Sequence, residues 1–396
     1  MTFQRAGLLV LALLALGLVL RLVVSARQSL WADEVFTLAM ATGHSLEHPA
    51  DAARPELGDF VQGDGARPAA EWARYVRFDS AGIAPRRILR AVALSDTSPP
   101  LYYLAVAVWL RVTGVRDSML HLFSVFWWLL TVPLLWSLAL EVGGPRAGRV
   151  ALALYAIAPM SIYYGTEVRM YSMAWCLAAL LAWISLRLSR NGGAGWLAGW
   201  VLTAAAGLLT HYFFVFPVAG AAVWLLSHSN RARRVSLLGA ALAVAALVFW
   251  WYAGLPESLE AWRVTGGWLK GRLGPLDLLA NGVKLVLAGL SSPGVAYAPT
   301  WVAAAGLAIV VAAIGYAAVR RLLPSCTPPV LLLLLTVAAA ALGPVFVDAL
   351  QGTYTSAIAR YALAALPATI ALFGGVLAAF PGRQPAAWIG ALAVVW

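Results

Sequence analysis

Two adjacent carboxylates, Asp33 and Glu34, lie in the segment SLWADEVFTL, directly after the first long apolar run of the chain. A carboxylate at the edge of a membrane is partly desolvated and can take a proton from an acceptor hydroxyl or amine. Because neighbouring side chains in a helix point in different directions, we expect one carboxylate to do chemistry and the other to orient it. We assign the general base to Asp33. The structural alternative is that these residues only cap or end an interfacial helix.

A second polar group lies in the segment YYGTEVRMYSM, where Glu167, Arg169 and Tyr171 separate two apolar runs. A guanidinium binds phosphate through two parallel hydrogen bonds, so Arg169 is a candidate phosphate ligand. The simpler interpretation is that Glu167 and Arg169 form an exposed ion pair of little energetic value.

Three further candidates begin or end apolar runs. His211, in LLTHYFFVFP, would be a hydrogen-bond donor beside a phosphate, although a lone histidine at a helix end is more often structural. Arg360 and Tyr361 begin the run RYALAALP. For these two residues the alternative is membership of the aromatic belt at the membrane surface.

The composition places these residues in a membrane protein. The chain has 396 residues, of which 62% are hydrophobic and 11% charged, and a mean hydropathy of +0.81. This excludes a soluble domain and predicts an all-α polytopic membrane protein with about ten or eleven transmembrane helices, which form one domain over residues 1–396. We expect apolar helices at residues 6–26, 119–141, 147–165, 171–189, 196–211, 213–228, 235–254, 301–321, 329–350 and 361–380. The last run, AAWIGALAVVW, is too short to span, so we expect the chain to be truncated within a helix.

Residues 27–118 differ from the rest and are predicted to form an outer polar loop with interfacial helices. Residues 98–114, SPPLYYLAVAVWLRVTG, fit either a short span or a helix at the interface. If they do not cross, five arginine clusters fall on the side of Arg5, which the positive-inside rule assigns to the cytoplasm. We therefore favour the interfacial interpretation, and we expect a second interfacial helix at 276–290. The net charge of +11 then reports topology and does not indicate binding to nucleic acid.

Together, the segments SLWADE, DTSPPLYYLAVAVWLRVTG, PMSIYYGTEVRMYSM, LTHYF and RYALAALP resemble the membrane glycosyltransferases of family 39. That group includes protein O-mannosyltransferases and the bacterial aminoarabinose transferase acting on lipid A. The resemblance implies a GT-C fold and a sugar donor linked to polyprenyl phosphate.

The same resemblance implies roles for individual residues. Asp33 and Glu34 fall on the family's catalytic acidic pair. Glu167, Arg169 and Tyr171 match a Glu-x-Arg-x-Tyr segment. The family's His-Pro-Pro segment corresponds to residues 98–100, with Ser98 in place of the histidine. We count Ser98 and the nearby Tyr102 among the substrate-binding candidates.

These observations predict an inverting glycosyltransferase, hexosyl or pentosyl, at the outer face of a bacterial inner membrane. Asp33 would deprotonate a lipid, glycan or protein acceptor, and Arg169, with Arg360 or His211, would stabilise the leaving phosphate. No cofactor is certain. Asp33, Glu34 and Asp96 have the oxygen ligands that Mg²⁺ or Mn²⁺ prefers, so a divalent cation stays open. The alternatives are a membrane transporter or lipid flippase, and a non-catalytic subunit of a glycan assembly system.

Overall fold

The computed structural model describes residues 3–61, 63, 65–66, 68–79, 82–95, 98–254, 269–290 and 300–395. The described residues form helices and loops, with one isolated β-bridge between Lys270 and Thr353. The α-helices are α1 (Phe3–Arg27), α2 (Ala32–Thr42), α3 (Ala69–Trp72), α4 (Pro85–Ser95), α5 (Leu101–Thr113), α6 (Asp117–Ile157), α7 (Pro159–Tyr164), α8 (Tyr171–Asn191), α9 (Ala194–Leu208), α10 (Val215–Ser227), α11 (Arg231–Tyr252), α13 (Pro275–Val286), α14 (Thr300–Val319), α15 (Pro328–Gln351), α16 (Leu366–Ala378) and α17 (Gln384–Val395).

Six helices within the described residues are long and apolar enough to cross a membrane. They are Gly7–Arg27, Asp117–Ile157, Tyr171–Asn191, Arg231–Tyr252, Pro328–Gln351 and Ala359–Ala378. Five shorter apolar helices accompany them: Leu101–Thr113, Ala194–Leu208, Tyr212–Ser227, Ala305–Val319 and Gln384–Val394. Of the ten apolar ranges predicted from the sequence, seven fall in these six long helices, because 119–141 and 147–165 share Asp117–Ile157, and three fall in shorter helices.

The separate helices predicted at 119–141 and 147–165 are the two arms of α6. The backbone between them is non-helical at Gly143 (φ −157°, ψ 27°) and Gly144, and the arms pack side by side, since Trp128 and Tyr155 stack at 5.5 Å. Gly144 has φ 68°, a conformation that glycine adopts without a steric penalty. The helix then ends early, at Ile157, because Pro159 forces the preceding Ala158 into an extended conformation (φ −60°, ψ 129°). The short helix α7 follows in a new direction.

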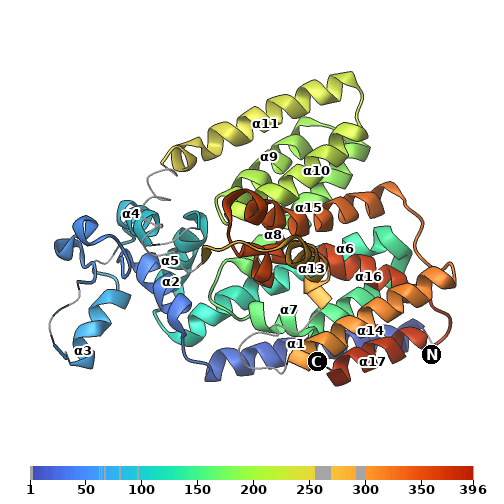
Figure 1. Ribbon diagram of the computed structural model, residues 1–396, viewed down its shortest axis with the longest axis horizontal. Coiled ribbons are helices and arrows are strands. Elements are labelled where there is room, and N and C mark those ends of the chain that lie inside the picture. The colour runs from blue at the N-terminus through green and yellow to red at the C-terminus, as the bar shows by residue number, and fades with distance from the viewer. Residues whose placement is uncertain are drawn as a thin grey trace.

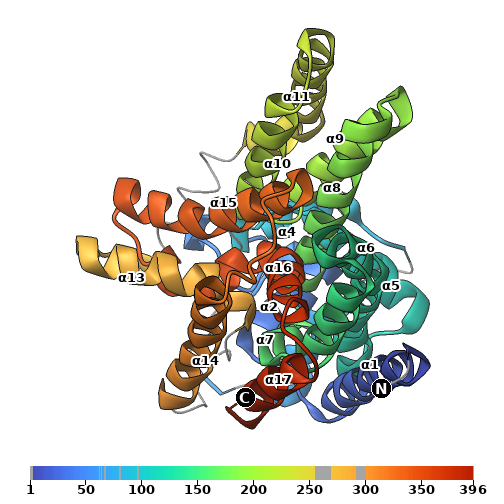
Figure 2. The ribbon, with the colours of Figure 1, turned by 90° about the vertical axis from the view of Figure 1, so that its right-hand side faces the viewer.

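The central helix of the bundle is α6, which packs against α1, α8 and α16 (Figures 1 and 2). Small residues allow α6 and α16 to approach closely: a Cβ added at Gly374 would lie 2.9 Å from the Cβ of Ala151. Trp128 of α6 and Tyr155 stack at 5.5 Å in the core beside α1.

A buried arginine fixes the end of α6. Arg21 of α1 lies over the ring of Trp128 at 4.0 Å and is fully buried. Its Nη2 donates to the hydroxyl of Ser161 at 2.8 Å, and its Nη1 donates to the carbonyl of Ala156 at 3.1 Å. These bonds satisfy a carbonyl in the last turn of α6 that the helix itself leaves without a partner. They hold the junction of α6 and α7, which leads into the candidate site.

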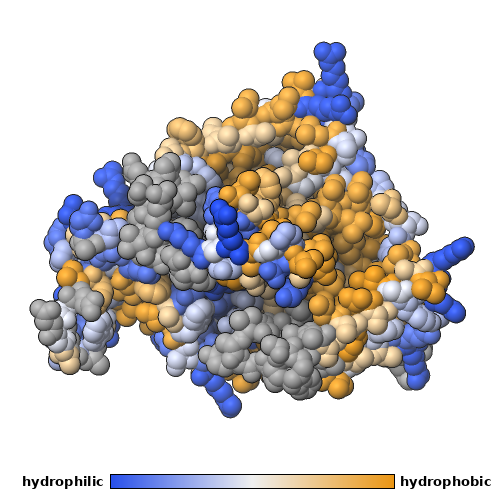
Figure 3. All heavy atoms as spheres, viewed as in Figure 1, coloured by the Kyte–Doolittle hydropathy of each residue, from blue (hydrophilic) through white to orange (hydrophobic). Residues whose placement is uncertain are grey.

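Residues of the predicted polar loop form a layer of short helices, α2 to α4, with α5 beside it (Figure 1). Asp59 is buried there and forms a 2.6 Å ion pair with Arg90 of α4. Figure 1 shows this layer at the left, at the end opposite to the N-terminus and to the α14–α15 connection, which carries Arg320 and Arg321. Hydrophilic side chains cover much of this left-hand layer, whereas apolar side chains dominate the middle of the molecule (Figure 3). The polar loop and the basic α14–α15 connection therefore lie at opposite ends of the bundle.

Candidate active site

The two adjacent carboxylates have different surroundings. Glu34 lies in the first turn of α2 with 0% exposure, and its two oxygens accept the backbone N–H groups of Val168 at 2.8 Å and Trp31 at 3.1 Å. The side chain of Asp33 is 28% exposed, and its Oδ2 lies 3.2 Å from Nη1 of Arg360. Both oxygens of Glu34 thus bind backbone N–H groups, whereas the side chain of Asp33 is accessible for chemistry.

Arg169 reaches the same turn of α2 from the loop between α7 and α8. Its Nη1 lies 3.3 Å from the hydroxyl of Thr37 and 3.5 Å from the carbonyl of Asp33. Arg169 is 9% exposed and Glu167 4%, so these residues do not form the exposed ion pair considered for the sequence. Burial raises the pKa of Glu167 to about 8, although Arg360 and Arg169 act to lower it. Glu167 therefore carries a proton at neutral pH and does not cancel the charge of the arginines.

Arg360 is placed by a tight loop after α15. Asp348, in the last turn of α15, accepts the backbone N–H of Thr355 at 2.8 Å and that of Ser356 at 2.7 Å, and the hydroxyl of Thr353 at 2.5 Å. The 3₁₀ segment Ala359–Ala365 follows and carries Arg360 at its start. This anchored loop brings a guanidinium to Asp33, 327 positions earlier in the chain.

An aromatic group lies next to the charged residues. His211 lies between Tyr171 and Tyr361, with 6.1 Å between ring centroids in each case, and Tyr361 stacks on Phe213 at 5.0 Å. The Nδ1 atom of His211 accepts the backbone N–H of Phe213 at 3.1 Å, which leaves the proton of a neutral ring on Nε2. Three residues that the sequence analysis named separately, Tyr171, His211 and Tyr361, thus lie side by side.

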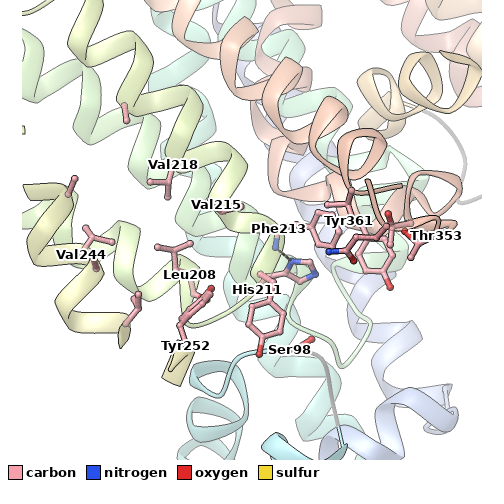
Figure 4. Close-up of a pocket in the computed structure, with 18 of the residues that line it drawn as sticks. Ser98, Leu208, His211, Phe213, Val215, Val218, Val244, Tyr252, Thr353 and Tyr361 are labelled. Atoms are coloured by element: carbon pink, nitrogen blue, oxygen red, sulfur yellow. Dashed lines mark hydrogen bonds between the residues drawn. The ribbon is translucent and has the colours of Figure 1, made fainter. Parts of the chain in front are cut away.

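His211 and Tyr361 line a cavity of about 590 Å³ (Figure 4). Its polar lining also includes Ser98, Gln351, Thr353 and Thr355. The remaining wall is mainly aliphatic and comes from α9, α10, α11 and α15; it includes Leu208, Val215, Val218, Val244, Val248 and Val347. An apolar pocket with a few polar groups at one side is typical of a binding site for an amphipathic ligand.

Three other residues, Ser98, Tyr102 and Asp96, were also candidates for this site. Ser98 is buried, with its hydroxyl 4.0 Å from the sulfur of Met170. Tyr102 is fully buried against Phe123 at 5.7 Å and does not line the cavity, so its contact with substrate stays a prediction. Asp96, the third member of the possible Mg²⁺ or Mn²⁺ site, lies outside the described residues. Within the described part of the chain, no group of three or more His, Cys, Asp or Glu side chains could hold a metal ion.

Sequence reasoning did not find four residues that position this site. They are Thr37, His121, Ser124 and Asp348. Each is a polar residue within or next to an apolar run. A polar side chain within an apolar helix is the one signal that sequence inspection offers for them.

Comparison with known proteins gives a match to one family model and a match to a solved structure. Residues 97–252 match the family model described as dolichyl-phosphate-mannose-protein mannosyltransferase. The crystal structure of ArnT from Cupriavidus metallidurans in the apo state matches with a TM-score of 0.52 and 15% sequence identity, over 73% of this chain and 51% of that one. The chain has a GT-C fold.

The GT-C fold and the family model confirm the resemblance predicted from the sequence and support a GT-C glycosyltransferase. The chain spans about half the length of the ArnT structure that it matches. No curated protein matches the sequence.

Proposed function

We propose that this chain transfers a sugar from a polyprenyl-phosphate donor to an acceptor at the outer face of the membrane. The observation that carries this proposal is the meeting of Asp33, Arg169 and Arg360 near the polar end of an apolar cavity. A donor of this class combines a phosphate with an isoprenoid chain, and the site offers guanidinium groups beside an aliphatic wall.

In the proposed reaction, Asp33 takes the proton of the acceptor hydroxyl or amine as the acceptor attacks the anomeric carbon. The bond between that carbon and the phosphate oxygen breaks, and the electron pair leaves with the phosphate. A single displacement of this kind inverts the anomeric centre. Arg169 and Arg360 stabilise the negative charge that grows on the phosphate.

Glu34 has an orienting role in this proposal. Both of its oxygens accept backbone N–H groups, and it has no exposed surface from which to meet a substrate. Its neighbour Asp33 is then fixed on the accessible side of α2. The sequence predicted that one carboxylate of the pair does chemistry and the other orients it. The proposal gives the orienting role to Glu34.

The proposed location rests on the charge distribution. The polar loop with Asp33 lies at the end of the bundle opposite to Arg320 and Arg321 of the α14–α15 connection (Figure 1). The positive-inside rule assigns the basic end to the cytoplasm and the site to the outer face of a bacterial inner membrane.

The test is transfer of radiolabelled sugar from a panel of polyprenyl-phosphate sugars by protein in lipid nanodiscs, with extracted membrane material as acceptor. Asp33→Asn should lower the rate about 10²- to 10⁴-fold, since a base is lost while the shape is kept. Asp51→Asn, an exposed carboxylate of the same loop, is the matched control. Full activity of Asp33→Asn would refute the base. Absence of transfer by the wild type over the whole panel would favour the transporter or non-catalytic alternatives.

A further inference from the structure

A cluster on α6 and α2 holds the loop that carries Arg169. Three consecutive residues, 166 to 168, are each bonded through the backbone to a buried side chain from another element. The Nδ1 atom of His121 donates to the carbonyl of Thr166 at 2.8 Å, and the hydroxyl of Ser124 donates to the carbonyl of Glu167 at 2.5 Å. Glu34 accepts the N–H of Val168 at 2.8 Å.

The two donors on α6, His121 and Ser124, donate to successive carbonyl groups of the loop. His121 and Ser124 are three residues apart, so their side chains lie on one face of the helix. Both are fully buried, which strengthens each hydrogen bond and makes its loss costly. Because both bonds go to main-chain oxygens, they fix the path of the loop whatever its side chains are.

Two members of the cluster, His121 and Glu34, also lie close to each other. His121 Nδ1 lies 3.7 Å from Oε1 of Glu34, the oxygen that accepts the N–H of Val168. The next residue along the loop is Arg169, whose backbone N–H turns back to the carbonyl of Glu167 at 2.8 Å. Arg169 then points to Thr37 on α2. The cluster therefore determines where the Arg169 guanidinium stands relative to Asp33.

We propose that His121 and Ser124 are positioning residues that set the Arg169 guanidinium in place to bind the donor phosphate. The inference rests on the proposed function in assigning Arg169 to phosphate. A displacement of about 1 Å at such a group can cost about 100-fold in rate, although neither positioning residue touches the substrate.

The first measurement is binding of undecaprenyl phosphate to the protein in nanodiscs. Ser124→Ala and His121→Leu should each raise the Kd about tenfold, as should Arg169→Gln. In the Arg169→Gln background, Ser124→Ala should change the Kd less than about twofold, because residues that act through one another are not additive. A purely structural contribution would give additive losses, and additive losses would overturn the proposal.

Two variants separate positioning from folding. His121→Asn keeps an N–H donor near the position of Nδ1 and should restore most of the affinity lost in His121→Leu. Ser137→Ala, in the same helix, removes a hydroxyl that bonds only to the carbonyl of Pro133 within α6, and its Kd should equal that of the wild type. If the α6 variants lower the melting temperature but leave the Kd unchanged, the proposal fails.

The outcomes also distinguish this inference from the proposed function. Coupled effects on phosphate binding in a protein that transfers no sugar would support the positioning role and overturn the glycosyltransferase proposal. Sugar transfer by the wild type, together with additive losses of affinity in the double variant, would support the glycosyltransferase proposal and overturn the positioning role. A wild type that binds no undecaprenyl phosphate would overturn both.

Discussion

Glu167 gives the sharpest test of the electrostatics at this site. Its carboxyl group is 4% exposed, and burial raises its pKa from the usual 4.5 to about 8, against the opposing effect of Arg360 and Arg169. Between these two pH values the folded protein keeps a proton that the unfolded chain has released. The stability that Glu167 contributes is therefore complete below pH 4.5 and is lost as the pH rises through about 8.

The size of the stability change follows from the difference between the two pKa values of Glu167. One proton held only by the folded state costs about 1.4 kcal/mol for each pH unit. Up to about 5 kcal/mol of unfolding free energy is thus lost between pH 4.5 and 8 in the wild type. Glu167→Gln has no proton to lose, so this part of the pH dependence should disappear. The variant should be close to the wild type at pH 5 and several degrees more stable at pH 9.

The assay is thermal unfolding in nanodiscs from pH 5 to pH 9, with the difference in melting temperature between variant and wild type plotted against pH. Glu71→Gln, at an exposed position in α3, serves as control for the loss of a carboxylate. A difference that stays flat from pH 5 to 9 would refute the reasoning, because Glu167 would then be ionised in the folded protein over the whole range.

Two further predictions concern other charged contacts. Arg360→Lys keeps the charge but loses the planar fork that binds phosphate, so steady-state transfer should show an approximately tenfold higher KM for the donor; an unchanged KM would remove Arg360 from the phosphate site. Asp59→Asn leaves Arg90 without its partner and should lower the unfolding free energy by about 3 kcal/mol at pH 7. Burial acts to raise the pKa of Asp59, but hydrogen bonds from Arg90 and two backbone N–H groups outweigh it and hold the pKa below the usual 3.8. This stabilisation is present above pH 3.8 and lost as the pH falls through the folded-state pKa, so the gap in melting temperature between Asp59→Asn and the wild type should narrow in acid.

Most of the fold could be predicted from the sequence, because apolar runs of membrane length are a strong signal. The spans near α1, α8, α11 and α15 agree with their predicted ranges within a few residues. The break predicted inside α6 is also present: the glycines that begin GGPRAGR, Gly143 and Gly144, have non-helical backbone and separate the two arms. The end of the second arm was less predictable: it stops at Ile157, eight residues before the predicted end, because Pro159 holds Ala158 in an extended conformation.

The site was less predictable, since its members come from distant parts of the chain. Asp33, Arg169 and Arg360 were candidates because charged residues at the ends of apolar runs stand out. Their contact could not be inferred, because it depends on the loop that Asp348 anchors. Likewise His121 and Ser124 are inconspicuous within a long apolar helix, and their role is visible only from the carbonyls that they meet.

The charge at the site fits the change that the proposed reaction makes. A sugar on polyprenyl phosphate is a phosphodiester with one negative charge, and the leaving phosphate monoester carries more. Two guanidinium groups, from Arg169 and Arg360, therefore interact more strongly with the transition state than with the bound donor, which is the condition for catalysis. An ionised Glu167 between them would cancel part of this difference. Burial that keeps Glu167 protonated at neutral pH thus preserves the charge imbalance on which the proposed reaction depends.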